Sequence, residues 1–381
     1  MKKTLIALAA LAATGAFAQT TTGAPGFQVT GNLNAGFVAN SYYGKSVSGF
    51  EQNLSGTSSI FFRGKEDLGG GLSAHFLHGT DIQFMAANGD RGAMYSATNA
   101  GAVGTFGNDQ KLVGIAGPFG TVNFGAINNQ SLYSGVVLLN PTLGTSYSGG
   151  YASIICADPN CTSVRYDNTI EYKSPVMSGF SATVQYAAKQ DQAINTNYSV
   201  TMGALNGPSM VEVGVKYANG PLTLAAVHLE TDATGVATAA TAAVKKSLDT
   251  ITGAYDLGNG LRLAAIYQHV LNDNTAVAAK SERDAFQASA LYRMGANEFV
   301  FNYGQSAEKN DARTTFGGQT SKLVAVAYKY YLSKMTTIEF KYENLDDAAA
   351  VVSAAVWPAS QLVTKTDNTR TRSGLGVNFN F

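Results

Sequence analysis

Short segments in which apolar and polar residues alternate follow one another along most of this chain. In SATVQY, residues 181–186, the second, fourth and sixth positions are apolar. In MVEVGVKY, residues 210–217, three valines and a tyrosine alternate with Glu212, Gly214 and Lys216. Successive side chains of an extended strand point to opposite faces. The alternation therefore predicts β-strands that each have one apolar face and one face polar enough to carry charge.

The same pattern returns in LRLAAIYQ, residues 261–268, and in TTIEFKYE, residues 336–343. A membrane-spanning helix needs about 20 consecutive apolar residues. No segment after residue 18 comes near that length, so we expect strands rather than helices throughout.

The connections between these segments alternate between short and long. Short turns are expected at 66–71, 117–120, 219–221, 258–260 and 294–296. Long polar connections are expected near 40–56, 81–108, 128–163, 190–208, 232–247, 271–283, 306–320 and 345–369. Short turns at one end and long loops at the other indicate an up-and-down antiparallel meander. Eight long loops and seven short turns predict sixteen strands, within the range of outer-membrane barrels.

Two architectures can use so many amphipathic strands. A soluble sandwich or propeller buries the apolar faces against one another, whereas a membrane barrel turns them toward lipid. Charged residues make up about 25% of a typical soluble chain, but only 14% of this one. Its 19 Tyr and 19 Phe suit the aromatic girdles of a membrane barrel. We therefore predict an all-β fold, a sixteen-stranded antiparallel transmembrane β-barrel with short periplasmic turns and long extracellular loops.

The chain ends on GLGVNFNF, residues 374–381, in which Leu375, Val377, Phe379 and Phe381 are spaced two apart. Chain termini usually fray unless something holds them. Hydrocarbon does not tolerate unpaired strand edges, so a membrane sheet must close on itself. We therefore expect this segment to be the last strand, paired with the first, and its apolar face to meet lipid.

Residues 1–18 are predicted to be a signal peptide. Lys2 and Lys3 are followed by an apolar stretch and by a small-residue cleavage motif, AFA, before Gln19. The mature chain, 19–381, is expected to form one barrel domain outside the cytoplasm.

The charge balance gives no reason to expect a nucleic acid partner. The 26 basic and 26 acidic residues cancel, and removal of Lys2 and Lys3 leaves 24 − 26 = −2. The two cysteines, Cys156 and Cys161, lie close together and are expected in an oxidising compartment, which favours a local disulfide. A zinc site would need further ligands, and no histidine is near.

Three segments resemble the trimeric general porins of Gram-negative outer membranes, most closely those of beta-proteobacteria. They are IFFRGKEDLGGGLSAHF (60–76), KLVGIAGPFGTVNFG (111–125) and SVRYDNTIEYKSPVMSGFSATVQY (163–186). The resemblance implies sixteen strands, a homotrimer in contact with outer-membrane lipid and lipopolysaccharide, and passive diffusion of small hydrophilic solutes and ions. The terminal Phe381 is similar to the family's outer-membrane sorting signal.

The resemblance also implies that the third long loop, here 128–163, folds into the lumen and narrows it. This loop is too long for an ordinary connection, and its GVVLLNP stretch is unusually apolar for a loop in water. Its only carboxylate is Asp158. The proposed bridge between Cys156 and Cys161 would stiffen its return segment.

In the family, basic residues on the wall face carboxylates on this loop. Arg165 matches such a wall arginine, with Tyr166 and Ile170 outward by alternation. However, Ser59, Asp109 and Ala126 stand where the family commonly carries arginine. The residues expected to line the constriction are Arg165, Arg63, Lys111, Asp109 and Asp158, with Lys65 near the turn. Because this set has few arginines, we predict weaker ion selectivity than in strongly anion-selective relatives.

Strand parity places further charges in the lumen. The basic set is Lys216, Arg262, Arg293, Lys329, Lys341 and Arg372, and the acidic set is Glu171, Glu212, Glu298 and Glu339. The alternative is that each residue only solvates the wall or pairs with a neighbour.

The function predicted is an outer-membrane porin with a water-filled channel, and the alternative is a substrate-selective outer-membrane channel. The second would present a path of lumen-facing aromatics or a dense ladder of charge, and neither is evident. A barrel enzyme would need a nucleophile beside a base, and a structural barrel would not conduct. No cofactor or metal is expected, since His75 and His78 lie three apart and point to opposite faces of a strand.

Overall fold

The computed structural model describes residues 26–42, 45–52, 58–82, 106–107, 109–131, 155, 165–188, 190–191, 205–207, 209–232, 244–274, 279–308, 320–346 and 369–381. Within these residues, no helix is long and apolar enough to cross a membrane.

The described part of the chain is built from antiparallel strands. The first eight are β1 (Gly26–Tyr42), β2 (Lys45–Gln52), β3 (Ser59–Gly69), β4 (Leu72–Asp81), β5 (Lys111–Gly117), β6 (Gly120–Asn128), β7 (Arg165–Lys173) and β8 (Phe180–Ala187). A small hairpin follows, β9 (Gln190–Asp191) with β10 (Leu205–Gly207). The others are β11 (Ser209–Asn219), β12 (Leu222–Asp232), β13 (Val244–Asp256), β14 (Leu261–Asn274), β15 (Ala279–Met294), β16 (Asn297–Glu308), β17 (Thr320–Tyr331), β18 (Thr336–Asp346) and β19 (Thr369–Asn380).

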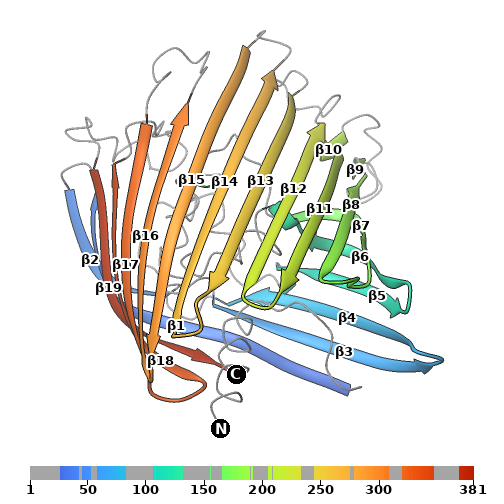
Figure 1. Cartoon of the computed structure of the whole chain (residues 1–381), viewed down its shortest axis with the longest axis horizontal. Coiled ribbons are helices and arrows are strands. Elements are labelled where there is room, and N and C mark those ends of the chain that lie inside the picture. The colour runs from blue at the N-terminus through green and yellow to red at the C-terminus, as the bar shows by residue number, and fades with distance from the viewer. Residues whose placement is uncertain are drawn as a thin grey trace.

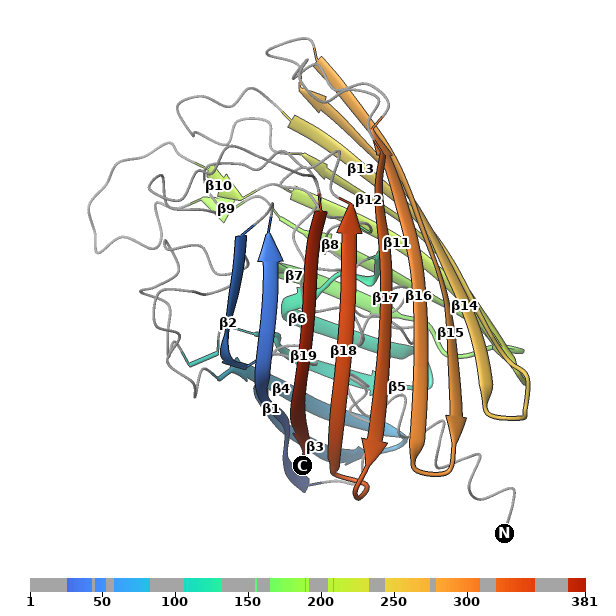
Figure 2. The ribbon, with the colours of Figure 1, turned by 90° about the vertical axis from the view of Figure 1, so that its left-hand side faces the viewer.

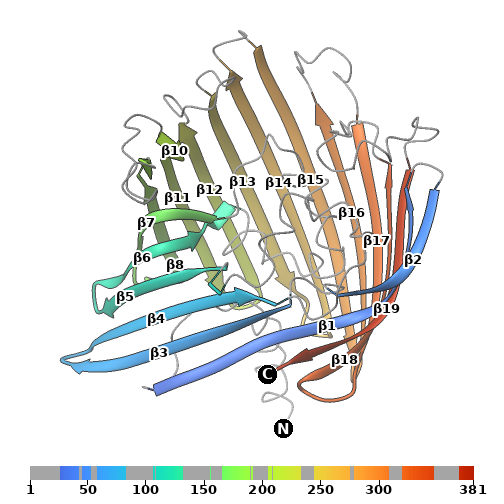
Figure 3. The ribbon, with the colours of Figure 1, turned by 180° about the vertical axis from the view of Figure 1, so that it is seen from behind.

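These strands form a closed wall of sixteen. β2 and β3 pair with successive halves of β1, residues 35–42 and 26–32, so together they occupy one position in the wall. β8 pairs with β11, and β19 pairs with β1, which completes the circuit. Figures 1 and 3 show β3 to β8 on one side of the barrel and β12 to β16 on the other. The predicted sixteen-stranded antiparallel barrel is confirmed.

The five predicted short turns are confirmed, but two of the predicted long loops are strand. Residues 40–42 and 45–52 lie in the paired strands β1 and β2, and residues 271–274 and 279–283 lie in the paired strands β14 and β15. In the β1–β2 hairpin the prediction was wrong because polar residues such as Asn40 and Glu51 face inward, where they bond to each other at 3.1 Å.

The closing seam lies between β1 and β19, beside each other in Figure 2. Asparagines line its inner side: Asn32 Nδ2 donates to Asn378 Oδ1 at 2.7 Å, and Asn34 Nδ2 donates to Asn32 Oδ1 at 2.8 Å. At the end of the chain, Phe381 and Gly31 exchange two backbone hydrogen bonds, at 2.9 and 3.1 Å. The last residue is therefore held as firmly as the strand interior, as the GLGVNFNF pattern predicts.

Most outward side chains are apolar and exposed, and most inward ones are buried. On β11, Val211, Val213 and Val215 are exposed, whereas Met210 and Glu212, which alternate with them, are buried. Leu375, Val377 and Phe379 on β19 are likewise exposed on the outer face. A mainly apolar exterior is the surface that a hydrocarbon layer requires.

Close backbone approach at the seam predicts sensitivity at one glycine. A Cβ at Gly36 on β1 would overlap the carbonyl oxygen of Leu375 and the Cα of Gly376 on β19, whereas a Cβ at Gly49 on β2 would meet nothing within 4 Å. We expect Gly36→Ala to destabilise the barrel by about 1–3 kcal/mol and Gly49→Ala to leave stability unchanged. Thermal unfolding in detergent measures both, and equal midpoints for the two variants would contradict this packing of the seam.

Candidate functional site

Two of the predicted constriction residues meet. The guanidinium of Arg165, at the start of β7, forms an ion pair with the carboxylate of Asp109, and its Nε donates to Asn128 Oδ1 at 2.9 Å. Asp81, on the inward face of β4, is close enough to Asp109 and Arg165 for their charges to interact. Two carboxylates thus accompany one guanidinium. Asp81 was missed, although alternation from His75 along β4 would have found it.

Arg63 is held against the inner wall near β1. Its Nη1 donates to Thr30 Oγ1 at 2.8 Å, and its guanidinium carbon lies 5.3 Å from the ring centre of Phe61. The hydrogen bond and the cation–π contact fix the charge beside the wall.

Lys111 does not face the lumen, so this prediction was wrong. Leu112, its neighbour on β5, is buried with Leu77 inside the barrel, whereas Lys111 shares the exposed outer face with Val113. The chain bends at Asp109, which breaks the alternation between positions 109 and 111. The inward position of Asp109 therefore does not predict which residues of β5 face inward.

A similar break lies in β7. Asn168 has a positive φ of 54°, and the pairing of β6 with β7 shifts register between Gly125 and Ile127. Tyr166 is therefore buried in a cluster with inward residues such as Leu229, and not outward as predicted. Ile170, beyond the break, is exposed on the outer face as expected.

Three of the predicted lumen cations lie near the short turns. Lys216 shares the inward parity of Glu212 on β11 and is exposed. Arg262 Nη1 lies 3.8 Å from Asp256 Oδ2, and the guanidinium carbon of Arg293 lies 4.2 Å from the ring centre of Tyr331.

The other predicted cations are paired with carboxylates. Lys329 Nζ lies 3.6 Å from Glu298 Oε1, and Lys341 Nζ lies 3.4 Å from Glu339 Oε2.

Arg372 Nη2 donates to Glu51 Oε2 at 2.5 Å. Asn40 also donates to this carboxylate. On β16 to β19 the inner wall thus carries neighbouring charges of opposite sign.

Glu212 holds the beginning of the predicted third loop. Its carboxylate, fully buried, accepts the backbone N–H of Gln130 at 2.5 Å and that of Ser131 at 2.9 Å. Gln268 Nε2, on β14, donates to the backbone oxygen of Ser131 at 3.4 Å. The predicted lumen charge Glu212 therefore acts as a structural anchor and does not line open space.

Glu171, on β7, also helps to hold the beginning of the predicted third loop. Gln185 Nε2 donates to its Oε2 at 2.6 Å and to the backbone oxygen of Asn128 at 3.0 Å. Asn123 Nδ2 donates to its Oε1 at 2.8 Å, and His75 Nε2 lies 2.7 Å from Asn123 Oδ1. Sequence reasoning missed Gln185 and Asn123 as partners, because parity gives the face of a residue but not the register that places these two beside Glu171 on the adjacent strands.

Ile155, inside the predicted third loop, lies within the barrel. It is fully buried in a cluster of inward residues from the far wall: Ala225, Val227, Ile266, Ala285, Leu323 and Leu345. This part of β12 to β18 is apolar on its inner face, although the alternation predicts a polar inner face for each strand. Ile155 of the predicted loop packs against these buried aliphatic side chains.

The remaining constriction residue, Asp158, and the pair Cys156 and Cys161 lie outside the described residues. Their disulfide stays a prediction. Among the described side chains, no group of three or more His, Cys, Asp or Glu residues is arranged to hold a metal ion.

A closed sheet that is apolar outside and ion-paired inside defines a membrane-spanning β-barrel. The chain belongs to the Gram-negative porin family, whose profile matches residues 4–350. It is thus an outer-membrane barrel of the porin type.

Outer membrane porin protein 32 of Delftia acidovorans is 34% identical over 233 residues, 58% of this chain and 58% of that protein. Major outer membrane protein P.IB of Neisseria lactamica is 26% identical over 284 residues, 74% of each chain. The match therefore spans less than two thirds of the first relative's length.

An anion-selective porin from Comamonas acidovorans shares the fold, with a TM-score of 0.69 and 20% identity over 93% of this chain and 99% of that one. OmpT of Vibrio cholerae does so with a TM-score of 0.63 and 15% identity, over 93% and 97%.

The anchor at Glu212 predicts a graded response to substitution. Glu212→Ala leaves two backbone N–H groups unpaired, at about 1–3 kcal/mol each, whereas Glu212→Gln keeps one acceptor oxygen. We expect the alanine variant to lower the thermal midpoint more than the glutamine variant does. The control is Glu66→Ala, at an exposed position beside the first short turn. If Glu212→Ala unfolds at the same temperature as Glu66→Ala, the anchor contributes nothing.

Proposed function

We propose that this chain forms a water-filled channel through which small hydrophilic solutes and ions diffuse passively, with weak ion selectivity. The observation that carries the proposal is the pairing of inner-wall charges, and above all the pair of Arg165 with Asp109. A cation with a bonded carboxylate attracts passing ions of either sign only weakly, since the two fields largely cancel beyond a few ångströms.

The inferred selectivity follows from the same pair. The Comamonas porin is described as anion-selective, which requires positive charge without a local counter-charge. Here Asp81 and Asp109 accompany Arg165. This arrangement supports a channel with little preference for anions.

A substrate-selective channel remains the alternative from the sequence, but no described feature favours it. The apolar patch on the inner face consists of buried aliphatic residues around Ile155. A sliding path for one solute class would instead need aromatic side chains exposed along the lumen.

We infer a homotrimer whose subunits meet through the outer face of β1 to β6. The most exposed large aromatics gather there: Phe27, Phe50 and Phe106 are 64%, 74% and 68% exposed. Phe62 lies between two of them, with ring centres 6.3 Å from Phe27 and 5.8 Å from Phe106. Aromatic side chains of this kind are enriched at protein interfaces.

A charge-deletion cycle tests the selectivity. We expect Arg165→Ser to shift the reversal potential in a salt gradient toward cations and Asp109→Asn to shift it toward anions, by up to about fivefold in permeability ratio. The double variant should return close to the wild type because the two charges compensate each other. Steep anion preference in the wild type, or no shift in either single variant, would contradict the proposal.

The subunit arrangement has its own test. We expect native mass spectrometry of the mature protein to give three chains, and Phe50→Asp to shift the population toward monomers because a charge would be buried at the contact. Phe301→Asp, on the outer face of β16, serves as the control. A monomeric wild type would refute the trimer without affecting the channel.

A further inference from the structure

Two histidines on the outer face of the barrel are held in the same way. His228 on β12 is the cross-strand partner of Asp249 on β13, and its Nδ1 lies 2.6 Å from Asp249 Oδ1. His269 on β14 is the partner of Asp284 on β15, and its Nδ1 lies 2.7 Å from Asp284 Oδ1. An ionised carboxylate only accepts hydrogen bonds. In both pairs, therefore, the ring donates its proton from Nδ1.

This hydrogen bond fixes the tautomer of each ring. With the proton on Nδ1, the neutral imidazole carries its lone pair on Nε2. A second carboxylate is close to that nitrogen in both cases: Glu230 Oε1 lies 3.4 Å from His228 Nε2, and Glu282 Oε1 lies 3.7 Å from His269 Nε2. A lone pair beside a carboxylate is unfavourable unless a cation lies between them, and that cation is either a proton or a metal ion.

The width of the gap distinguishes a proton from a metal ion. An N–H···O hydrogen bond joins atoms about 2.7–3.2 Å apart, and both Nε2 gaps exceed this range. Zinc binds an imidazole nitrogen at about 2.0–2.1 Å and a carboxylate oxygen at about 2.0–2.2 Å, so its tetrahedral angle separates the two atoms by about 3.3–3.5 Å. The gap between His228 and Glu230 is 3.4 Å, and it therefore fits a tetrahedral metal ion.

The first of these sites lies where the outer face changes from apolar to polar. On β12 the outward residues nearer the turn are apolar, and those that follow are His228, Glu230 and Asp232. On β13 the change falls between Ile251 and Asp249. The side chains of His228, Glu230 and Asp249 are 49%, 68% and 53% exposed. An ion from the surrounding water can therefore reach them.

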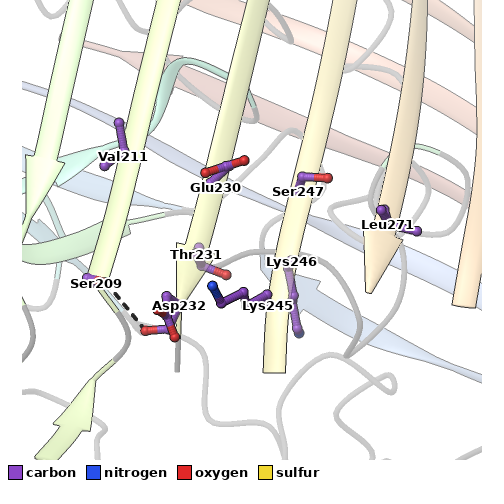
Figure 4. A pocket seen from close by; sticks show the side chains of 9 residues that line it. All are labelled: Ser209, Val211, Glu230, Thr231, Asp232, Lys245, Lys246, Ser247 and Leu271. Atoms are coloured by element: carbon purple, nitrogen blue, oxygen red, sulfur yellow. Dashed lines mark hydrogen bonds between the residues drawn. The ribbon is translucent and has the colours of Figure 1, made fainter. Parts of the chain in front are cut away.

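Space beside the site accommodates water. Glu230 lines a cavity of about 310 Å³ at the upper ends of β11 to β14, as Figure 4 shows. Lys245, which also lines this cavity, extends toward Thr231 and Asp232 in the same view. Its ammonium group is therefore directed to Asp232 and not to Glu230. Water molecules in the cavity can complete the coordination of an ion bound to Glu230.

We propose that His228 and Glu230 bind a divalent transition-metal ion such as Zn²⁺, and that Asp249 positions the imidazole. Metal-bound histidines almost always donate their other ring N–H to a carboxylate or a similar acceptor. Only two side chains contact the ion, which agrees with the absence of a three-ligand group among the described side chains. Water fills the remaining positions.

The second histidine forms a copy of this site. His269 and Glu282 are the two ligands, and Asp284 positions the ring. The wider gap of 3.7 Å makes this copy the weaker one, because the ion cannot reach both atoms at ideal bond lengths and angle.

The ligand set also selects the kind of ion. An imidazole nitrogen with a carboxylate suits Zn²⁺ or Cu²⁺, whereas Ca²⁺ and Mg²⁺ prefer oxygen ligands alone. A surface cluster of carboxylates would bind the second kind. The site lies on the outer face, so it is independent of conduction through the lumen.

The test uses the purified full-length mature protein in detergent, freed of metal with a chelator, and calorimetric titration with Zn²⁺ near neutral pH. We expect two sites per chain, and an excess of Ca²⁺ should not displace the zinc. His228→Gln should leave the weaker site, and His228→Gln combined with His269→Gln should leave none. Asp249→Asn should weaken the first site about tenfold. Asp346→Asn, at an exposed position on β18, is the control and should change nothing.

Electron paramagnetic resonance of bound Cu²⁺ reports the ligands directly. We expect coupling to one imidazole nitrogen per copper ion, and its loss in the double histidine variant.

Three outcomes would overturn the proposal. Failure of the wild type to bind zinc would mean that the gaps hold protons only. Displacement of zinc by Ca²⁺ would make this a carboxylate site for oxygen-preferring cations. Unchanged zinc binding in the double histidine variant would place the ion elsewhere. The first two comparisons use wild-type protein alone, so they hold whether or not the variants fold.

Discussion

The whole structure depends on one constraint: a β-sheet in hydrocarbon cannot leave a backbone N–H or C=O group unpaired. Sixteen strands satisfy it only when the last pairs with the first, and here β19 pairs with β1 over residues 32–42 and 370–380. The two backbone bonds between Gly31 and Phe381 extend the pairing to the final residue. Gly36 makes the close approach possible, because any side chain there would overlap β19.

Closure places the apolar faces of the strands outside. The polar side chains inside the barrel then pair with one another through ion pairs and hydrogen bonds. The inner wall does so in two ways. At the start of β7 and on β16 to β19, cations are paired with carboxylates, as Arg165 is with Asp109. Between the walls, the carboxylates of Glu171 and Glu212 accept bonds from the segment that opens the third loop. Ile155 then packs on an aliphatic patch of the far wall, so a loop that enters the barrel is held at two separate places.

Much of this could be predicted from alternation alone. A period of two identified the strands, and the low fraction of charged residues indicated that their apolar faces point outward. The spacing in GLGVNFNF predicted the closing strand. Strand parity predicted the wrong face where the backbone departs from the two-residue period of an extended strand. The bend before Lys111 and the positive φ of Asn168 each reverse the faces of the residues beside them. The residue types at these positions predict neither the bend nor the positive φ. The apolar inner patch could not be predicted because it packs against Ile155, which is distant in sequence.

Backbone amide exchange of β1 and β19 in lipid nanodiscs tests the closure most directly. If the seam is paired as described, amides of residues 32–40 and 372–380 exchange as slowly as those in the middle of β14, since each is bonded and shielded by lipid. Fast exchange confined to β1 and β19 would mean two free edges, and the barrel would not be closed.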